Sequence, residues 1–481
     1  MSENRIFITI NGQKLSVDKG TRIEELFRGK KGKKDSLIVG ARVNNQIREL
    51  TYPIEEECTI EPVDLTSEDG IRIYQRSLTF LLIKAVRDLF PEKIIQIRHS
   101  VSRGIFFEII DHKVTGQDAE KIEKRMREIV EMNKEIKKLT LPVDEAKEFF
   151  LKTGREDRYR LVKNRKKDYV TLYELDDVRD YFYGHMVPST GYLNLFRIEA
   201  HHDGIVLMTP KKDSPNEIPD IPIPQKLFGI FTEYSDWLSI LGVEDVGNLN
   251  EAVENGKIDE LVLISEALHE KKIASIADMI KSQQPQKRVI LIAGPSSSGK
   301  TTFAQRLSVQ LRVNGLVPLN ISVDDYFVNK SRTPLDEEGK PDYEALEAVD
   351  LELFNNDLIT LLNGGEVELP KYNFITGERE YTGRKLRMEE GQVLVIEGIH
   401  ALNPGLTSKV KEENKFKIYI SAITSMRIDM HNRIPTTELR LLRRIVRDNR
   451  FRGTPAPRTI DMWPNVRRGE ERNIFPFQEA I

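Results

Sequence analysis

Residues 288–302 read Arg-Val-Ile-Leu-Ile-Ala-Gly-Pro-Ser-Ser-Ser-Gly-Lys-Thr-Thr, and this stretch decides the fold of the second half of the chain. The apolar run 289–293 predicts a buried strand. After it, Phe303, Leu307 and Leu311 recur every four residues, which predicts a helix. The loop between them follows the pattern G-x-x-x-x-G-K-[ST], and a strand before it and a helix after it are the context that a phosphate-binding loop requires.

This loop supplies the groups that bind nucleotide phosphates. Glycines let backbone N–H groups approach phosphate oxygens closely, and the start of the following helix adds partial positive charge. Lys300 is expected to reach the β- and γ-phosphates, and the Thr301 hydroxyl is expected to bind a magnesium ion. We therefore predict a nucleotide site formed by Gly294, Ser296, Ser297, Ser298, Gly299, Lys300, Thr301 and Thr302.

Two further apolar runs end in acids. Residues 319–323 lead to Asp324, and residues 392–396 lead to Glu397. Because the carboxyl ends of parallel strands meet at one edge of a sheet, we expect both carboxylates beside the phosphates. A kinase with such a loop needs one group that accepts the proton of the attacking hydroxyl and one that helps to hold the metal. A strand-end acid can also be a simple cap or turn residue, but two of them after a phosphate-binding loop favour phosphoryl transfer.

Composition sets the broad class of the protein. At 481 residues, two to four domains are expected, and 31% charged with 39% hydrophobic residues is typical of globular domains. The net charge of −3 gives no global argument for a nucleic-acid or membrane partner. Cys58 is the only cysteine, which excludes an intrachain disulfide framework and a cysteine-based zinc cluster. No apolar stretch reaches the ~18 residues of a membrane helix, so we expect a cytoplasmic protein.

The first region, residues 1–66, has the pattern of a small β-grasp domain. Two short apolar runs flank Asn11-Gly12, which is a strong hairpin signal. Thr21 with Glu24 predicts the capped start of a short helix, and strand-like pieces follow it. The order of these pieces resembles the TGS domain at the front of threonyl-tRNA synthetases. That resemblance implies binding or regulation rather than catalysis.

The second region, residues 67–225, resembles the second additional domain of threonyl-tRNA synthetases. The resemblance rests on 118–126, 141–146 and 187–191. In those enzymes this domain edits mischarged tRNA with three histidines and a cysteine. The corresponding positions here are Phe80, Lys84, Phe182 and Met186. With all four groups replaced, we expect no editing and instead a binding or scaffold role, for which RNA or a small regulator would be the partner.

Prolines and helical patterns predict the structure at the end of the second region and in the connector after it. Five prolines within 210–225 exclude a helix or a central strand, so we expect a loop. A helical linker is predicted over 226–285. His201 and His202 could suggest a metal site, but neighbouring residues on a strand point to opposite faces. We therefore expect one packed and one exposed histidine.

The last region, residues 286–481, resembles the uridine kinase and phosphoribulokinase family. The phosphate-binding loop carries this resemblance together with 322–327, 369–374, 395–400 and the arginine-rich run 440–448. It implies an α/β domain with a parallel sheet that uses ATP and Mg²⁺. The whole chain is then a multi-domain protein of mixed α/β and α+β class. The family continues through another strand and helix after this point, so we expect either that the domain is shortened at its C-terminal end or that one sheet edge is built differently.

The resemblance also implies roles for individual residues. Asp324 corresponds to the base that takes the proton of the acceptor hydroxyl, and Glu397 corresponds to the acid near magnesium. The arginines of a lid helix would offset phosphoryl charge, although a solvated helix face explains the same run; they are Arg443, Arg444 and Arg447. The acceptor would contact Tyr326, Glu344, Tyr372 and Phe374. His400 is expected to have a packing role.

The identity of the acceptor is the weakest part of the resemblance. Uridine kinases have an aspartate and a histidine at the positions of Asn373 and Gly377. We expect a nucleoside, similar to uridine or cytidine, that is phosphorylated on its 5′-hydroxyl. Two alternatives stay open: a kinase for another small hydroxyl compound, and a nucleotide-sensing protein that binds RNA or a regulator through its first half. The sequence does not decide whether the chain forms a homo-oligomer.

Overall fold

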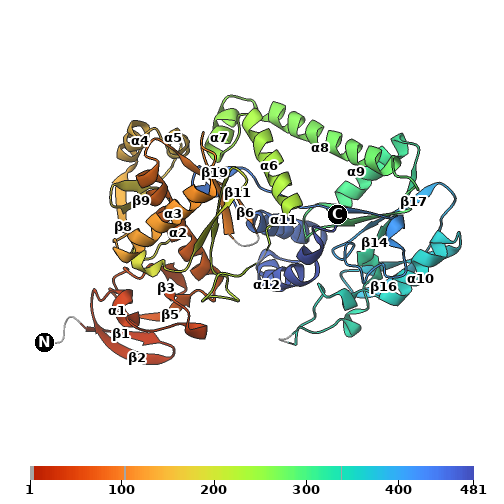
Figure 1. Cartoon of the computed structure of the whole chain (residues 1–481). Coiled ribbons are helices and arrows are strands. Elements are labelled where there is room, and N and C mark those ends of the chain that lie inside the picture. The colour runs from red at the N-terminus through yellow and green to blue at the C-terminus, as the bar shows by residue number, and fades with distance from the viewer. Residues whose placement is uncertain (1–4, 102–103, 221, 337–338) are drawn as a thin grey trace. The chain divides into compact units, whose positions relative to one another are not determined.

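The computed structural model describes residues 5–101, 104–220, 222–336 and 339–481. The chain folds as two compact units, whose elements are labelled in Figure 1. Unit 1 consists of Met1–Gly256 and Ser425–Ile434, and unit 2 consists of Lys257–Thr424 and Pro435–Ile481. No helix among the described residues is long and apolar enough to cross a membrane.

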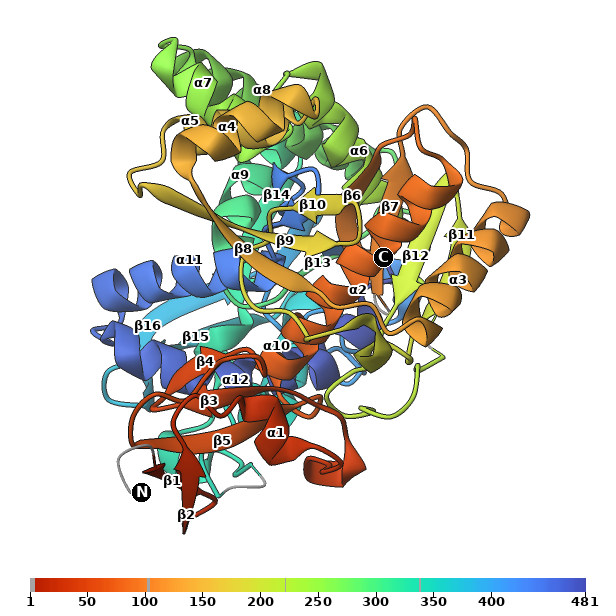
Figure 2. The same ribbon diagram turned by 90° about the vertical axis from the view of Figure 1, so that its left-hand side faces the viewer.

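Unit 1 begins with a five-stranded sheet in the order β2-β1-β5-β3-β4 (Figure 2). Only β1 and β5 are parallel neighbours. The predicted hairpin is confirmed, because Asn11 and Gly12 both have positive φ, 50° and 80°, as a tight type I′ turn requires. The strands are β1 (Arg5–Ile10), β2 (Gln13–Asp18), β3 (Ile38–Val43), β4 (Gln46–Arg48) and β5 (Cys58–Asp64).

The short helix of this region begins one residue later than the sequence suggests. Helix α1 (Ile23–Phe27) starts after Arg22, whose backbone N–H donates to the Glu25 carboxylate at 3.1 Å. Thr21 instead donates its hydroxyl to the carbonyl of Asp18 at 2.7 Å. The predicted Thr21–Glu24 cap is therefore wrong by one position, because Arg22 is still extended (φ −78°, ψ 146°) and Ile23 is the first helical residue.

The second part of unit 1 is an α+β layer in which helices α2 (Glu68–Leu89) and α3 (Gly116–Glu131) share a core with a four-stranded antiparallel sheet. The sheet order is β11-β12-β7-β6. Helix α2 begins at Glu68 because the Ser67 hydroxyl accepts from the Gly70 N–H at 3.1 Å and caps it. The strands are β6 (Ile95–Val101), β7 (Gly104–Ile109), β11 (Arg197–His201) and β12 (Gly204–Met208).

A smaller layer and two helices complete the N-terminal part of unit 1. The described residues between 209 and 224 contain no helix or strand, as their prolines predict. The predicted helical character of the connector is confirmed, and its first two helices belong to unit 1. The elements are β8 (Lys137–Pro142), β9 (Tyr169–Leu175), β10 (Val178–Asp180), α4 (Val143–Lys152), α5 (Glu156–Lys163), α6 (Gln225–Ile240) and α7 (Val246–Glu254).

A segment from late in the sequence completes unit 1. Strands β19 (Arg427–Asp429) and β20 (Asn432–Arg433) form a small hairpin in the segment 425–434. Asp429 is fully buried and accepts from the guanidinium of Arg158 at 3.2 Å, and Arg158 itself is only 1% exposed. The backbone of Met430 accepts from the N–H of Ile97 at 2.8 Å. No pattern in the sequence indicates these contacts, which join residues more than 270 positions apart.

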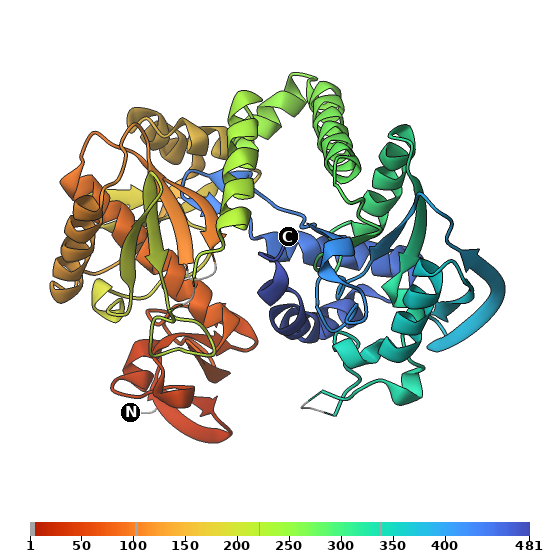
Figure 3. The same cartoon turned by 45° about the vertical axis from the view of Figure 1, so that its right-hand side comes forward.

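Unit 2 is built on a parallel sheet in the order β14-β17-β13-β18, which confirms the predicted class (Figure 3). Alternate residues of β13 face opposite sides: Ile290 and Ile292 pack against helices α8 and α9, and Val289 and Leu291 pack on the side of α10. The bounds are β13 (Val289–Ala293), β14 (Val317–Ser322), β17 (Gln392–Glu397), β18 (Lys415–Tyr419), α8 (Ile258–Lys281), α9 (Lys300–Val313) and α10 (Leu351–Leu362).

The remaining elements of unit 2 surround the carboxyl edge of this sheet. A long hairpin of β15 (Glu366–Asn373) and β16 (Glu378–Arg387) follows α10. Two packed helices, α11 (Thr436–Phe451) and α12 (Ala456–Asn473), end the unit. The 3₁₀ turn η3 (Val323–Tyr326) follows β14 directly. The edge of the sheet, the hairpin and α11 thus place polar side chains from distant segments in one region.

Candidate active site

The phosphate-binding loop joins β13 to α9 as the sequence predicts. Position 294 requires glycine, because the Cβ of any other residue there would lie 2.0 Å from the carbonyl oxygen of Ile420. Gly299 stands at the start of α9 with φ of 102°, in the left-handed region that favours glycine. The hydroxyl oxygens of Ser297 and Ser298 are buried and have no hydrogen-bond partner among the described residues. Such unpaired polar atoms beside a helix start fit an anionic ligand.

Lys300 and Thr301 begin α9 at the centre of the site. The amine of Lys300 donates to the carbonyl oxygens of Gly294 at 3.0 Å and Pro295 at 3.3 Å, so the side chain folds back over the loop. Burial lowers the pKa of this amine. The Thr301 hydroxyl donates to the Glu397 carboxylate at 3.1 Å. The structure therefore brings together the two residues that the sequence assigns to magnesium.

Glu397 lies at the tip of β17 and is held by two hydroxyl groups. The second donor is Ser322, at 2.9 Å, from the end of the neighbouring strand β14. Burial raises the pKa of Glu397, and the negative charge of Asp324 raises it further. A hydroxyl and a carboxylate oxygen side by side are ligands that Mg²⁺ prefers, so Thr301 and Glu397 fit this ion. Among the described residues there is no group of three or more His, Cys, Asp or Glu side chains that could hold a metal by itself.

The arginines of α11 are of two kinds, buried and exposed, and the sequence alone does not distinguish them. Arg440 and Arg444 are buried and hold the loop: Arg440 donates to the carbonyl of Ser296 at 3.1 Å, and Arg444 donates to its hydroxyl at 2.7 Å. Arg443 is exposed and donates to the carbonyl of Ser297 at 2.9 Å. Of the three predicted charge-stabilising arginines, Arg443 and Arg447 line the nucleotide-side cavity, and Arg444 mainly supports the loop.

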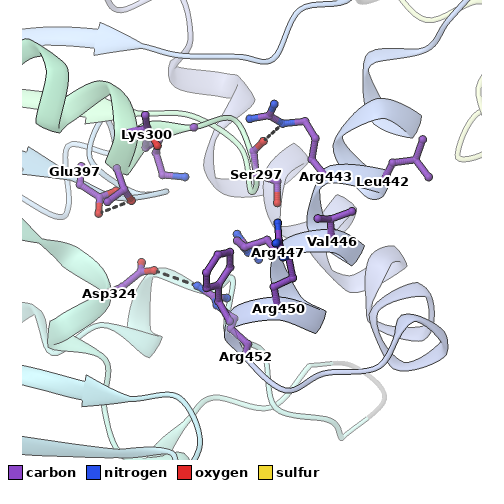
Figure 4. A pocket seen from close by; sticks show the side chains of 14 residues that line it. Ser297, Lys300, Asp324, Glu397, Leu442, Arg443, Val446, Arg447, Arg450 and Arg452 are labelled. Carbon is purple, nitrogen blue, oxygen red and sulfur yellow. Dashed lines mark hydrogen bonds and ion pairs between the residues drawn. The ribbon is translucent and has the colours of Figure 1, made fainter.

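A cavity of about 580 Å³ extends from the loop along α11 (Figure 4). Its lining includes residues that the sequence assigns to ATP, magnesium and phosphoryl transfer, from the phosphate-binding loop, the ends of β14 and β17, and α11. Asp324 faces Arg452 across this cavity at 4.0 Å. The lining residues are Ser297, Gly299, Lys300, Thr301, Thr302, Asp324, Glu397, Leu442, Arg443, Val446, Arg447, Arg450, Phe451 and Arg452.

A second cavity of about 400 Å³ adjoins the first. The two cavities share four lining residues: Lys300, Asp324, Arg447 and Arg452. Beyond these, the second cavity is lined by aromatic and polar side chains that include Phe327, Lys330, Tyr343, Glu344, Tyr372, Phe374, Arg444 and Arg458. The predicted acceptor residues Glu344, Tyr372 and Phe374 are therefore in one place.

Tyr326 is the predicted acceptor residue that lies elsewhere. Its side chain is 1% exposed and its hydroxyl donates to Asp357 at 2.9 Å, in the core beside Phe354. Phe327 lines the second cavity in its place, with its ring 5.5 Å from that of Tyr372. The turn η3 rotates consecutive side chains in different directions, so one residue of the Tyr-Phe pair must face the core and the sequence alone does not say which.

Glu344 gives the second cavity a buried acid. Burial raises its pKa to about 7, against the lowering effect of the Arg444 guanidinium. One of its carboxylate oxygens has no hydrogen-bond partner among the described residues. Helix α12 approaches it closely, because a Cβ on Gly469 would lie 2.2 Å from the Cβ of Glu344. This carboxyl group is suited to receive a hydrogen bond from, or donate one to, a bound acceptor.

Two further residues complete the description. Arg452 was not predicted, yet its guanidinium lies 4.0 Å from Asp324 and 4.3 Å from the ring centre of Phe374, so it joins the two cavities. It stands four residues after the arginine-rich run 440–448, and this proximity is the signal that could have found it. His400 is fully buried and lies outside the lining of both cavities. Burial lowers its pKa to about 4, which keeps it neutral, as a packing role requires.

In unit 1, the four positions that correspond to editing groups are filled by packed side chains. The rings of Phe80 and Phe182 lie 5.3 Å apart, and Met186 is 1% exposed. Lys84 pairs with Asp88 at 2.5 Å and Asp177 at 2.7 Å. The region that would hold a hydrolytic site is therefore occupied by core contacts and a satisfied ion pair.

The two adjacent histidines of unit 1 differ from the expectation in their direction. Strand β11 ends at His201, and His202 has a positive φ of 49° in the following turn. Their rings consequently lie 4.6 Å apart instead of on opposite faces, and both contact Phe228. They belong to no metal-binding group among the described residues.

Comparison with known proteins finds different relatives for different parts of the chain. Residues 289–476 match the model of the phosphoribulokinase / uridine kinase family. The threonine–tRNA ligase of Aquifex aeolicus is 29% identical over 201 residues, which are 41% of this chain and 31% of that protein. The corresponding enzyme of Syntrophotalea carbinolica is 31% identical over 165 residues, 34% of this chain and 26% of that protein.

These matches confirm both resemblances: to the kinase family in the C-terminal region and to threonyl-tRNA synthetases in the N-terminal region. The chain spans less than a third of the length of these two ligases. A solved structure described as a possible uridine kinase from Bacillus stearothermophilus aligns with a TM-score of 0.27 and 24% identity, over 31% of this chain and 79% of that chain.

Proposed function

We propose that the C-terminal region, which matches the phosphoribulokinase / uridine kinase family, transfers the γ-phosphoryl group of ATP to a hydroxyl group of a small molecule. One observation supports this above the others: a cavity at the phosphate-binding loop and a cavity lined by aromatic residues share Lys300, Asp324, Arg447 and Arg452. A donor phosphate in the first and an acceptor hydroxyl in the second would meet at these four side chains.

The residues at this meeting point have the chemistry that the transfer needs. Asp324 is the proposed base, which takes the proton as the acceptor oxygen bonds to the γ-phosphorus and the bond to ADP breaks. Lys300 and the loop amides would hold the phosphates, and Arg443 and Arg447 would offset the charge that develops. Thr301 and Glu397 would hold magnesium, which when bound neutralises phosphate charge.

The acceptor cavity favours a flat ring joined to a hydroxyl group. The rings of Tyr372 and Phe374 lie 5.2 Å apart with near-perpendicular planes, and Phe327 adjoins both. Aromatic side chains arranged in this way stack against a planar base. We therefore propose a nucleoside, phosphorylated on its 5′-hydroxyl. Glu344 would bind a polar group of this acceptor.

For unit 1 we propose a binding or scaffold role for RNA or a small regulator. The observation that supports it is the packed state of Phe80, Phe182 and Met186, which leaves the editing positions without hydrolytic groups. Within this unit we propose that residues 1–66 and 67–225 act as separate modules. If the kinase reaction is absent, this role with ATP as a signal becomes the better proposal.

The kinase proposal is tested by transfer of labelled γ-phosphate from ATP to ribonucleosides, deoxyribonucleosides and other small hydroxyl compounds. Lys300→Ala serves as the inactive variant, and Lys287→Ala is the matched control because Lys287 lies outside both cavities. We expect a labelled nucleoside monophosphate with the unmodified protein and with Lys287→Ala only. Binding of ATP without transfer to any acceptor would contradict the kinase proposal and favour a nucleotide-sensing function.

A further inference from the structure

Helix α11 lies along the nucleotide-side cavity in a defined direction. Near its C-terminal end, Arg452 reaches Asp324 at 4.0 Å, where the proposed transfer takes place. At the middle of the helix, Arg443 donates to the carbonyl of Ser297 in the phosphate-binding loop at 2.9 Å. Figure 4 shows both contacts at opposite ends of the helix segment that lines the cavity. The part of the helix that lines the cavity therefore has one end beside Asp324 and a far end beside the phosphate-binding loop.

The far end of this helix presents apolar side chains to the cavity. Leu442 and Val446 line it, are 62% and 56% exposed, and stand one helical turn apart on the same face. Figure 4 places both beside Arg443 on the side away from Asp324. From Arg452 to Leu442 the helix advances ten residues, or about 15 Å at 1.5 Å per residue. Phe451, which is 77% exposed, also lines the cavity beside Arg452, so apolar side chains line both ends; on the side away from Asp324 they are Leu442 and Val446.

The two apolar side chains, Leu442 and Val446, indicate what this far end binds. Phosphates need N–H groups and cations, which the loop and the arginines supply, and they gain nothing from a leucine or a valine. A nucleobase and ribose bring apolar surface that is stabilised when it leaves water. We infer that Leu442 and Val446 form the wall on which the nucleoside part of the donor nucleotide packs. The inference rests on the proposed kinase function and adds two positioning residues to it.

The proposed wall also implies selectivity for a nucleotide over a bare polyphosphate. Neither Leu442 nor Val446 carries a polar side-chain atom, so neither can read the hydrogen-bonding edge of a base. They distinguish a nucleotide from a bare polyphosphate by contact with the face of the ring. The contribution of the two side chains is therefore present for ATP and absent for inorganic tripolyphosphate.

The experiment compares these two probes. Dissociation constants of ATP and of inorganic tripolyphosphate, each with Mg²⁺, are measured by calorimetry for the unmodified protein and for the Leu442→Ser, Val446→Ser double variant. Both residues are exposed, so the substitutions leave the fold intact. The matched control is Val262→Ser with Leu263→Ser on α8, a valine and a leucine that are 53% and 71% exposed and lie outside the cavity.

We expect the double variant to bind ATP about tenfold more weakly, with the dissociation constant of tripolyphosphate unchanged within about twofold. The control should change neither value. Equal weakening of both probes, or no weakening of ATP, would overturn the inference while leaving the kinase proposal in place. Failure of the unmodified protein to bind either probe would instead contradict the proposed nucleotide site, so the two failures are distinguishable.

Discussion

The guanidinium of Arg440 donates to the carbonyl oxygen of Ser296 at 3.1 Å, across a sequence separation of 144 residues. Arg440 is 2% exposed and also pairs with Glu470 of α12, which is fully buried and accepts from the Ser296 N–H at 3.2 Å. Helices α11 and α12 are therefore part of the structure of the phosphate-binding loop. The conformation of Ser296 depends on charges that the sequence places far from it.

We predict that Arg440→Ala destabilises unit 2 and that Arg443→Ala leaves its stability nearly unchanged, although the two residues stand on the same helix. Arg440→Ala removes one of two guanidinium partners of the buried Glu470, leaving Arg467 at 2.8 Å, and should lower the free energy of unfolding of unit 2 by about 3 kcal/mol. Arg443 is exposed, so Arg443→Ala should change that free energy by less than about 0.5 kcal/mol. Urea unfolding measures both values.

Although Arg443→Ala should leave the stability of unit 2 nearly unchanged, it should lower the rate of phosphoryl transfer. We expect Arg443→Ala to lower kcat about 10²-fold in the labelled-phosphate assay, because one charge-stabilising group is lost from the transition state. Arg443→Lys, which keeps the positive charge, is the control and should recover part of this loss. An unchanged kcat for Arg443→Ala would show that this residue only covers the loop.

The role of Asp324 is tested against its neighbour in the sequence. Asp324→Asn keeps the shape of the side chain but removes the proton acceptor, so kcat should fall about 10²–10⁴-fold while the dissociation constant of ATP stays within about threefold. Asp325→Asn is the matched control. Asp325 pairs with Lys371 at 3.1 Å and lies outside both cavities. Full turnover of Asp324→Asn would show that another group takes the proton.

The local part of this site could be predicted from the sequence, and the reason is physical. A phosphate-binding loop is made by consecutive residues between a strand and a helix, so Gly294, Gly299, Lys300 and Thr301 carry their own geometry. The acids at the ends of β14 and β17 follow from the rule that parallel strands end at one edge. In this loop and at these strand ends, structure and sequence agree because neighbours in the chain and the strand order determine the contacts.

The parts that the sequence did not reveal depend on distant contacts. The periodicity of α11 places its arginines on faces, but it cannot say that Arg440 meets Glu470 or that Arg443 faces the cavity. Tyr326 and Phe327 are both aromatic and adjacent, and only the packing of Phe354 against the first decides which one enters the core. Arg452 is recognisable only once Phe374 and Asp324 are seen on either side of it.

Glu344 should make the stability of unit 2 depend on pH. Its folded-state pKa of about 7 lies above the ordinary 4.5, so the folded protein retains a proton that the unfolded chain has lost. The stabilisation is complete below about pH 4.5 and disappears as pH rises towards 7. The groups around it act in both directions: Arg444 and Lys300 favour the charged form, while Glu470 and Asp324 oppose it.

The measurement is the urea midpoint of unit 2 at pH 5 and at pH 7.5. We expect the unmodified protein to be more stable at pH 5, and Glu344→Gln to reduce that difference, because the amide does not titrate. Glu347→Gln is the control, since Glu347 lies outside both cavities and should leave the difference unchanged. An identical pH dependence for Glu344→Gln and the unmodified protein would assign the titration to another group.

The segment 425–434 should be essential for the stability of unit 1. Asp429 is fully buried, and its carboxylate accepts from Arg158 at 3.2 Å and from the N–H groups of His431 and Asn432, both at 2.9 Å. Asp429→Ala removes all of these acceptors and leaves the buried Arg158 guanidinium with fewer partners. We expect the free energy of unfolding of unit 1 to fall by about 3–5 kcal/mol.

The control for this prediction is an exposed ion pair of the same unit. Asp203 pairs with Lys113 at 3.3 Å, with side chains 67% and 83% exposed, so Asp203→Ala should cost less than about 1 kcal/mol. Urea unfolding of the full chain, followed by hydrogen exchange at the amide of Ile97, reports on unit 1 because this amide donates to Met430. Faster exchange at Ile97 in Asp429→Ala alone would establish that the late segment holds unit 1 together. Equal exchange in both variants would mean that the hairpin only rests on a unit that is stable without it.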